Sequence, residues 1–385
     1  MVPNGWSRLK LPEFAWFQEG PGLRNWQFTE SGCKVINITN IVDGTLDLSK
    51  TDRHISEEEL KDKYSHFLCD AGDIVLASSG NSYCKHGIVR EQDLPLVMNT
   101  SVIRFKALEN CDYEFLNQFL KSSYLKKQID ILITGGAQPN FGPVHLKQIE
   151  LNLPPLPEQQ KIATILSTWD KAISTTERLI DNSTQQKKAL MQQLLTGKKR
   201  LLDESGKRFE KKWEEVELGE ISHITTGSSN REDSSLTGEY AFFDRSIDVR
   251  TSGIFLFDAE AIIVGGEGQD FVPKYFEGKF DLHQRTYAIM DFKNAYGKFL
   301  FYYIGYYRHY FLSQAVGSTV KSLRLPMFQK MPIKLPSVKE QQKIATVLTN
   351  ADKEIELLEQ QLADLQQEKK ALMQVLLTGK VRVLV

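Results

Sequence analysis

A few groups of residues in this chain could in principle do chemistry, and the spacing of each group argues against the corresponding reaction. An enzyme that methylates adenine must hold the extruded base, commonly with a polar residue, two prolines and an aromatic residue, and needs a glycine-rich loop for S-adenosylmethionine. Pro154-Pro155 is followed by Leu156 and lacks both flanking residue types. Gly265-Gly266-Glu267-Gly268 follows an apolar run, but its spacing is not that of a dinucleotide-binding loop, and a turn is the better interpretation.

Two other groups of reactive side chains also have better structural interpretations. Glu59-Leu60-Lys61, with Asp52 upstream, contains residues that a nuclease could use, but a lone Glu-x-Lys in a charged helix is usually a solvated surface. His66-x2-Cys69 and Cys84-x-His86 hold four residues of the types that bind zinc, yet their spacing matches no standard zinc finger. Buried cysteine and hydrogen-bonded histidine are the commoner outcome. We therefore predict no metal site and no catalytic residue.

One sequence segment occurs twice. EQQKIAT at 158–164 returns at 340–346, and KKALMQ-x-LLTGK at 187–198 returns at 369–380, both displaced by 182 residues. Residues 158–198 match residues 340–380 at 24 of 41 positions. A repeat restricted to these segments predicts a duplicated frame whose remaining parts have diverged.

Apolar residues recur in alternating steps of four and three along both copies, as in a coiled coil. Each copy predicts one long helix that ends at a glycine cap, Gly197 or Gly379. Because such a seam must be buried, the simplest partner for each helix is the other helix, in an antiparallel pair. Lys187 and Lys369 interrupt the seam at matching positions, where a lysine either fixes the register or extends its charge to solvent at the edge. The predicted seam residues are Ile162, Leu166, Trp169, Ile173, Ile180, Leu190, Leu194, Ile344, Leu348, Ile355, Leu358, Leu362, Leu365, Leu372 and Leu376.

The helical copies, 158–204 with a linker and 340–385, leave two blocks, 1–157 and 205–339, each the usual size of one domain. The blocks show the same order of elements, with strands predicted at 34–41, 72–77 and 102–105 before a helix at 113–133, and at 261–264 and 287–292 before a helix at 297–311. Each then reaches a polar loop led by glycine and a short strand that ends in Leu-Pro. The predicted fold class is α+β, with two globular α/β domains separated by two long helices.

Composition restricts the location and the partners. The chain has no run of about twenty apolar residues, its first residues lack the basic and apolar regions of a secretion signal, and its four cysteines lack CxxC spacing, so we expect a cytoplasmic protein with reduced thiols. Lys and Arg number 48 against 49 Asp and Glu. Because there is no basic excess, any surface that binds nucleic acid must be a local patch created by folding.

The repeated segments resemble a known family. GGAQPNFGPVHLKQIELNLPPLPEQQKIATIL followed by KKALMQQLLTGKKR is similar to the central region of type I restriction-modification specificity subunits, and the second copy is similar to their C-terminal conserved region. The resemblance covers the whole chain in layout: target-recognition domain, long helix, target-recognition domain, long helix. It implies an antiparallel coiled coil with a pseudo-two-fold internal repeat.

The resemblance also implies a function. Such a subunit has no chemistry of its own, recognises an asymmetric bipartite site on double-stranded DNA, and brings two methyltransferase subunits to it. Restriction and translocase subunits join through the methyltransferase subunits. No cofactor is then expected in this chain, and S-adenosylmethionine belongs to the partner methyltransferase. Two alternatives remain: an adaptor in which the coiled coil spaces two protein-binding domains without DNA specificity, and an enzyme whose catalytic residues have no recognisable motif.

Base-reading residues can be predicted only from loop chemistry, because polar side chains reach base edges from loops held by a rigid sheet. Arg231 and Arg285 carry guanidinium forks suited to guanine and are the preferred specificity residues. Gln138 and Asn140 lie in the GGAQPN segment of the resemblance, which favours a role in backbone positioning or loop structure over sequence choice. For every candidate, an exposed turn residue is an equal alternative. The candidates are Ser79, Asn81, Tyr83, Lys85, Gln138 and Asn140 in the first domain, and Ser229, Asn230, Arg231, Gln269, Gln284, Arg285, Lys321 and Arg324 in the second.

Overall fold

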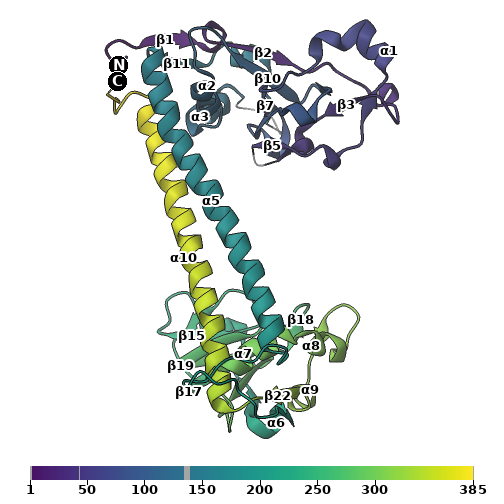
Figure 1. Cartoon of the computed structure of the whole chain (residues 1–385), viewed down its shortest axis with the longest axis vertical. Coiled ribbons are helices and arrows are strands. Elements are labelled where there is room, and N and C mark those ends of the chain that lie inside the picture. The colour runs from purple at the N-terminus through teal and green to yellow at the C-terminus, as the bar shows by residue number, and fades with distance from the viewer. Residues whose placement is uncertain (1, 43, 134–138, 385) are drawn as a thin grey trace. The chain divides into compact units, whose positions relative to one another are not determined.

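A computed structural model describes residues 2–42, 44–133 and 139–384. The chain divides into two compact units, Met1–Glu177 with Gln361–Val385 and Arg178–Gln360. The division falls within two long helices, α5 (Leu156–Leu194) and α10 (Val338–Leu376), so each unit contains one end of both helices (Figure 1). Each unit combines these helix ends with small β-sheets, which confirms the predicted α+β class.

The first unit is built around a four-stranded antiparallel sheet. The strands of the whole unit are β1 (Ser7–Lys10), β2 (Ala15–Glu19), β3 (Cys33–Ile36), β4 (Ile41–Val42), β5 (Thr45–Leu46), β6 (His54–Ile55), β7 (Ile74–Ala77), β8 (His86–Ile88), β9 (Leu96–Met98), β10 (Val102–Ala107) and β11 (Glu150–Leu153). The main sheet has the order β2-β10-β7-β8, and a second sheet runs β6-β3-β9 with β3 and β9 parallel. Strand β1 pairs with β11, antiparallel, just before α5 begins.

The central strand β7 shows why this sheet is buried on both faces. Its four residues are all apolar and all buried, the pattern expected for a covered strand. Ile74 and Leu76 join one core cluster, and Val75 and Ala77 join another on the opposite face. The first of these cores also receives Phe115 from the short helices that follow β10. The helices of this unit are α1 (Glu57–Glu59), α2 (Tyr113–Leu120), α3 (Ser123–Leu132) and α4 (Pro143–Leu146), with part of α5 and of α10.

The second unit contains a seven-stranded sheet in the order β13-β20-β17-β19-β15-β16-β14. The strands of the whole unit are β12 (Glu214–Glu217), β13 (His223–Thr226), β14 (Ser234–Ser235), β15 (Tyr240–Phe243), β16 (Arg250–Ser252), β17 (Phe257–Gly265), β18 (Glu267–Gly268), β19 (Lys274–Leu282), β20 (Thr286–Met290), β21 (Lys321–Ser322) and β22 (Pro332–Leu335). Its shorter helices are α6 (Leu218–Ile221), α7 (Gly297–Tyr306), α8 (His309–Gln314) and α9 (Leu325–Gln329). A parallel bridge between Ser229 and His283 joins the segments that follow β13 and β19, so the sheet curls on itself.

Both long helices end in the predicted way. Gly197 and Gly379 have positive φ angles of 72° and 70°, which a residue with a side chain rarely adopts. Behind each glycine the chain donates back into the last turn, from Lys199 N to Gln193 O at 3.0 Å and from Val381 N to Val375 O at 3.2 Å. Each glycine N–H also donates within the last turn, from Gly197 N to Leu194 O and from Gly379 N to Leu376 O, both at 3.3 Å, so carbonyl groups at both helix ends are satisfied. The sequence placed the helix ends within two residues of their observed positions.

The two globular domains pack on identical apolar residues of the helices, which we call the platform. In the first unit the platform consists of Ile162, Ala163, Leu166, Leu376 and Leu377, and in the second of Ile344, Ala345, Leu348, Leu194 and Leu195. All ten are buried. The predicted seam therefore has two different environments: its end residues belong to the domain cores, while the residues in the middle of the helices are only half-buried.

A glutamate at the start of each helix is clamped by an arginine beyond the end of the other helix. In the second unit, Arg200 donates two hydrogen bonds to the buried carboxylate of Glu340, at 2.6 and 2.7 Å. In the first unit, Arg382 donates two to Glu158, both at 2.7 Å. Bidentate contacts of this kind are the strongest hydrogen bonds that side chains make. A tryptophan lies under each guanidinium, Trp213 in one case and Trp6 in the other.

The glutamine that follows each of these glutamates is completely buried and ties the helix to its domain. Gln159 accepts from Asp112 N at 2.7 Å and donates to Pro154 O at 2.8 Å. Gln341 accepts from Tyr296 N at 2.7 Å and donates to Pro336 O at 2.8 Å. The identity of the EQQKIAT copies thus has a physical explanation at its first, second, fifth and sixth positions, where the side chains form the clamp, this tie and the platform.

The recurring lysines of the seam each pair with an aspartate on the other helix. Lys369 forms an ion pair with Asp170, and Lys187 forms one with Asp352. The residue numbers of each pair add up to 539, so the two pairs specify the same antiparallel register. The register role that the sequence left open is therefore supported over simple extension to solvent. Each aspartate also bonds to its domain, Asp170 to Gln118 and Asp352 to the Tyr302 hydroxyl.

Three sequence-based elements were wrong in extent. The helix predicted at 113–133 is two helices, because the Ser122 side chain accepts from Leu125 N at 3.2 Å and begins α3. The run at 297–311 is likewise divided between α7 and α8. The strand predicted at 34–41 ends at Ile36, where the Asn37 side chain caps a short 3-10 turn.

His86, one of the residues considered for zinc, is a buried neutral side chain, and this predicts a pH dependence of stability. Its Nε2 donates to Asn117 Oδ1 at 2.6 Å, and burial lowers the pKa of His86 to about 4. Between pH 6.5 and 4 the unfolded chain binds a proton that the folded chain refuses, so stability falls as pH falls through this window. The expected contribution is about 3 kcal/mol, at 1.36 kcal/mol per pKa unit.

The measurement is urea unfolding of the chain and of the variant His86→Gln between pH 7 and pH 4. The variant should show a smaller loss of unfolding free energy over this range. Equal losses in both proteins would contradict the assignment.

Within the described residues, no group of three or more His, Cys, Asp or Glu side chains is placed to hold a metal ion.

In the part of the chain that the structure describes, no helix combines the length and the apolar character needed to cross a membrane. The long helices α5 and α10 are rich in charged and polar residues instead.

Candidate DNA interface

In the second domain, the turn at residues 283–285 is hydrogen-bonded to three other loop segments, so four loop segments meet at one place. His283 N donates to Phe243 O at 2.9 Å, Gln284 N donates to Ser229 O at 3.0 Å, and Gly266 N donates to Arg285 O at 2.8 Å. The ends of β13, β15 and β17 are therefore fixed to the turn between β19 and β20 by backbone hydrogen bonds. A rigid sheet that presents several loops at one place is the arrangement needed to read base edges.

Polar and charged side chains of these four segments line a hollow of about 240 Å³. Glu267 lies between Arg245 and Arg285 and accepts a hydrogen bond from each. Arg231 lies beside the buried Asp244, with 3.8 Å between Nε and Oδ2. Three arginines thus face two carboxylates, which gives a local positive balance in a chain without a basic excess.

Five of the eight residues predicted in the second domain gather at this place. Arg231, Gln284 and Arg285 line the hollow, and Asn230 accepts a hydrogen bond from Gln284 at 2.6 Å. Ser229 is buried beneath them and donates to Asp281 at 2.6 Å, so its side chain supports the loop. Lys321 lies on β21, and this strand pairs with β18. Gln269 is exposed and follows β18 directly. Arg324 is exposed at the start of α9.

His283 adds no charge to this group at neutral pH. Its Nδ1 accepts a hydrogen bond from Arg285 N at 3.0 Å, which leaves the proton on Nε2. Burial lowers the pKa of His283, and the neighbouring arginines lower it further. The imidazole is therefore a neutral hydrogen-bond donor beside the arginines.

The first domain presents a smaller group of candidates around the loop after β7. Ser79 bridges to Asn140, Gly80 N donates to Pro139 O at 3.0 Å, and Phe141 N donates to Ser78 O at 2.9 Å. Asn140, Asn81 and Lys85 are exposed around this joined loop. The Tyr83 hydroxyl is already bonded to Asp130 and Lys126. Gln138 lies outside the described residues.

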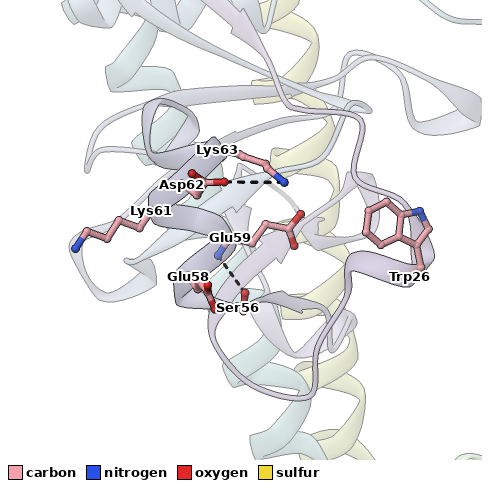
Figure 2. Close-up of a pocket in the computed structure, with 7 residues that line it drawn as sticks. All are labelled: Trp26, Ser56, Glu58, Glu59, Lys61, Asp62 and Lys63. Carbon is pink, nitrogen blue, oxygen red and sulfur yellow. Dashed lines mark hydrogen bonds and ion pairs between the residues drawn. The ribbon is translucent and has the colours of Figure 1, made fainter.

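A different hollow of the first domain has the wrong charge for DNA (Figure 2). Trp26, 81% exposed, lies at its edge, and Glu58, Glu59 and Asp62 supply carboxylates against two lysines. Glu59 accepts from Gln27 at 2.6 Å, and its backbone N donates to the Ser56 hydroxyl at 3.1 Å, as at a helix start. The Glu-x-Lys considered for a nuclease is thus part of a capped helical turn on an acidic surface, which repels phosphate.

The sequence reasoning missed Arg245 and Glu267. Arg245 follows the apolar strand Tyr240–Phe243, and a basic residue just after a buried strand could have been nominated by the rule that selected Arg285. Glu267 was considered only within a glycine turn. That turn is present, because a side chain on Gly266 would lie 2.7 Å from Arg285 O. The glycines allow the close approach that brings Glu267 to the arginines.

Two β-rich domains, each packed on its own copy of the platform and each with its own polar loop surface, define a two-part recognition protein. A family model described as the type I restriction modification DNA specificity domain matches residues 3–182 and 210–367. The chain therefore belongs to the family of type I restriction-modification specificity subunits, which are non-catalytic subunits.

Individual proteins show the same relationship. The chain is 32% identical over 204 residues to the MjaVIII specificity subunit of Methanocaldococcus jannaschii, covering 52% of this chain and 48% of that protein, about half its length. It is 25% identical over 408 residues to the MjaX specificity subunit of the same organism, covering 99% and 95% of the two chains. The fold matches a crystal structure of a type I restriction-modification S subunit from M. genitalium, with a TM-score of 0.63, 17% identity and 98% of each chain covered.

Proposed function

We propose that this chain recognises an asymmetric bipartite site on double-stranded DNA and carries two methyltransferase subunits to it. The observation that supports this most is the contrast between the repeated and the diverged parts. The platform, the clamp and the tie are the same in both copies, whereas the loop surfaces around residues 79–85 and 283–285 are unlike. Identical supports with different loops suit two half-sites of different sequence. In this proposal residues 1–157 and 205–339 are the two target-recognition domains.

The partner surface is proposed from repeat identities that internal packing does not use. Gln160, Thr164 and Lys171 are exposed on α5, and the matching Gln342, Thr346 and Lys353 are exposed on α10. Each set lies near a shallow hollow, lined by Thr164 and Lys171 in one unit and by Gln342 and Thr346 in the other. Two copies of one surface suit two copies of one partner, which we propose to be the methyltransferase subunit. Restriction and translocase subunits then join through it.

The methyl donor is proposed to belong to the partner. Pro154 and Pro155, considered above for adenine binding, instead begin α5: Pro155 O accepts from Glu158 N and Gln159 N, and Pro154 O accepts from the Gln159 side chain. Gly266 approaches Arg285 O, and Gly265 approaches the backbone of Arg245. These residues are therefore already used structurally.

Methyl transfer from labelled S-adenosylmethionine to DNA tests the proposal. The purified chain alone should transfer no methyl groups, and the complex with its methyltransferase subunit should methylate one defined bipartite motif. A methyltransferase subunit combined with a different specificity subunit is the control, and it should methylate a different motif. Methylation by this chain alone, or methylation by the complex without a sequence motif, would refute the proposal.

A further inference from the structure

Two arginines of the second domain share one carboxylate. Glu267 Oε1 accepts from Arg285 Nη1 at 2.7 Å, and Glu267 Oε2 accepts from Arg245 Nη1 at 3.1 Å. The glutamate side chain is 17% exposed, whereas the arginine side chains are 55% and 63% exposed. The anchor is therefore mostly buried, and the two guanidinium groups project from it toward solvent.

The backbone holds Glu267 in place from both sides. Glu267 pairs with Ser322 in the β18–β21 ladder, and Leu323 N donates to Gly266 O at 2.8 Å. On the other side, Gly266 N donates to Arg285 O at 2.8 Å. An exposed ion pair between two long side chains usually loses its geometry to side-chain entropy. Here the sheet fixes the backbone of Glu267, and the carboxylate is 17% exposed, so the hydrogen bonds that it accepts restrict the orientation of both arginines.

The charges around this pair favour a base edge over a phosphate group. A phosphate would lie beside the Glu267 carboxylate, and like charges at such short distance repel. Guanine presents two neutral acceptors, O6 and N7, in the major groove, which match one guanidinium fork. Each arginine uses one Nη1 donor on Glu267 and retains further donors, since a guanidinium has five N–H groups.

We propose that Arg245 and Arg285, held by Glu267, read guanine in the half-site recognised by the second domain. This inference rests on the proposed function that the chain reads DNA. Arg245 and Arg285 are the specificity residues, and Glu267 is a positioning residue that acts through them. The ligand is the major-groove edge of a G·C pair, and a contact to the phosphate backbone is the competing outcome.

Methylome sequencing of a strain in which this chain is the sole specificity subunit gives the first test. The variants are Arg245→Ala, Arg285→Ala and Glu267→Gln, with Arg308→Ala as the matched control. Arg308 is also an exposed arginine of the second unit and pairs with a carboxylate, Asp270, at 3.3 Å. In this pair the carboxylate is 59% exposed, whereas that of Glu267 is 17% exposed. Each arginine variant should make a G·C position degenerate in one half-site only. Discrimination should fall about 5- to 150-fold, equivalent to roughly 1–3 kcal/mol for a bidentate contact.

The variant Glu267→Gln should weaken discrimination at the same positions without removing either fork. Because it deletes a negative charge, it should also bind unrelated DNA more tightly at low salt. Arg308→Ala should leave the motif unchanged. If the variants of Arg245, Arg285 and Glu267 keep the wild-type motif while methylation continues, this inference is wrong and the proposed function still stands. A wild-type complex that methylates no defined motif would instead refute the proposed function.

The lysine variants Arg245→Lys and Arg285→Lys separate base reading from phosphate contact. Lysine keeps the charge but loses the planar fork. We expect these variants to lose discrimination while the salt dependence of binding stays unchanged. Retention of the motif by both would overturn the inference in favour of phosphate contact. If a variant abolishes methylation, its melting temperature and its affinities for the cognate duplex and for single-base substituted duplexes decide the matter. Loss confined to the cognate sequence supports base reading, and equal loss on every duplex, or unfolding of the arginine and lysine variants alike, overturns it.

Discussion

Replacing residues 205–339 with the corresponding block of another specificity subunit is expected to change one half of the methylated DNA motif completely and to leave the other half unchanged. The physical reason is the platform. The core of the second domain closes onto Leu194, Leu195, Ile344, Ala345 and Leu348, all of which lie outside the exchanged block. An incoming domain therefore meets the same apolar surface as the one that it replaces.

The measurement is methylome sequencing of strains that carry the parental or the exchanged chain. The reciprocal exchange of residues 1–157 is the control, and it should alter the other half of the motif. Changes in both halves after a single exchange would show that the domains do not read DNA independently. Complete loss of methylation with a correctly folded chain would show that the block boundaries do not enclose a recognition unit.

Breaking the clamp in the second unit is expected to destabilise that unit by about 3 kcal/mol, because removal of one partner leaves a buried charge without its counterion. The Glu340 side chain is 1% exposed and that of Arg200 is 19% exposed. Arg200→Ala and Glu340→Ala should each produce this loss, and the double variant should lose little more than either, because the two residues act as one unit. Lys211→Ala is the control, since its exposed pair with Glu214 should contribute less than about 1 kcal/mol.

Denaturant unfolding followed by fluorine NMR can report on the second unit alone. Trp213 is the single tryptophan between residues 178 and 360, and it lies under the Arg200 guanidinium. A fluorinated Trp213, assigned with Trp213→Phe, therefore follows unfolding where the clamp is. Strictly additive losses in the single and double variants would show that Arg200 and Glu340 do not stabilise the fold through their contact.

The helical frame could be predicted almost completely from the sequence because its signals are local. Steps of four and three residues, a glycine after the last turn, and a lysine at matching places are each visible within about ten residues. The partners of the polar residues that recur in both repeats could not be predicted. Glu340 meets Arg200 across 140 residues and Glu158 meets Arg382 across 224, and no periodicity links them.

The candidate site shows the same limit in another form. Asn230, Arg231, Gln284 and Arg285 could be nominated one by one from loop chemistry, since each is a polar residue near a strand end. Their convergence depends on the curled sheet, which brings residues 229 and 283 together across 54 positions. Glu267 was overlooked because a carboxylate argues against DNA binding when it is considered alone. Its role as an anchor becomes visible only with both arginines in place.

The paired lysines and aspartates of the seam also bear on association between different copies of the chain. Inside one chain, Lys369 meets Asp170 and Lys187 meets Asp352, so each half-buried lysine has a counterion. In a parallel association of two α10 helices from separate chains, Lys369 would face Lys369, and two like charges would be forced together at an apolar seam. A polar residue at such a position restricts the choice of helix partner at a cost in stability. The lysine that fixes the register within the chain thus also disfavours a parallel pairing of α10 with α10 of another chain.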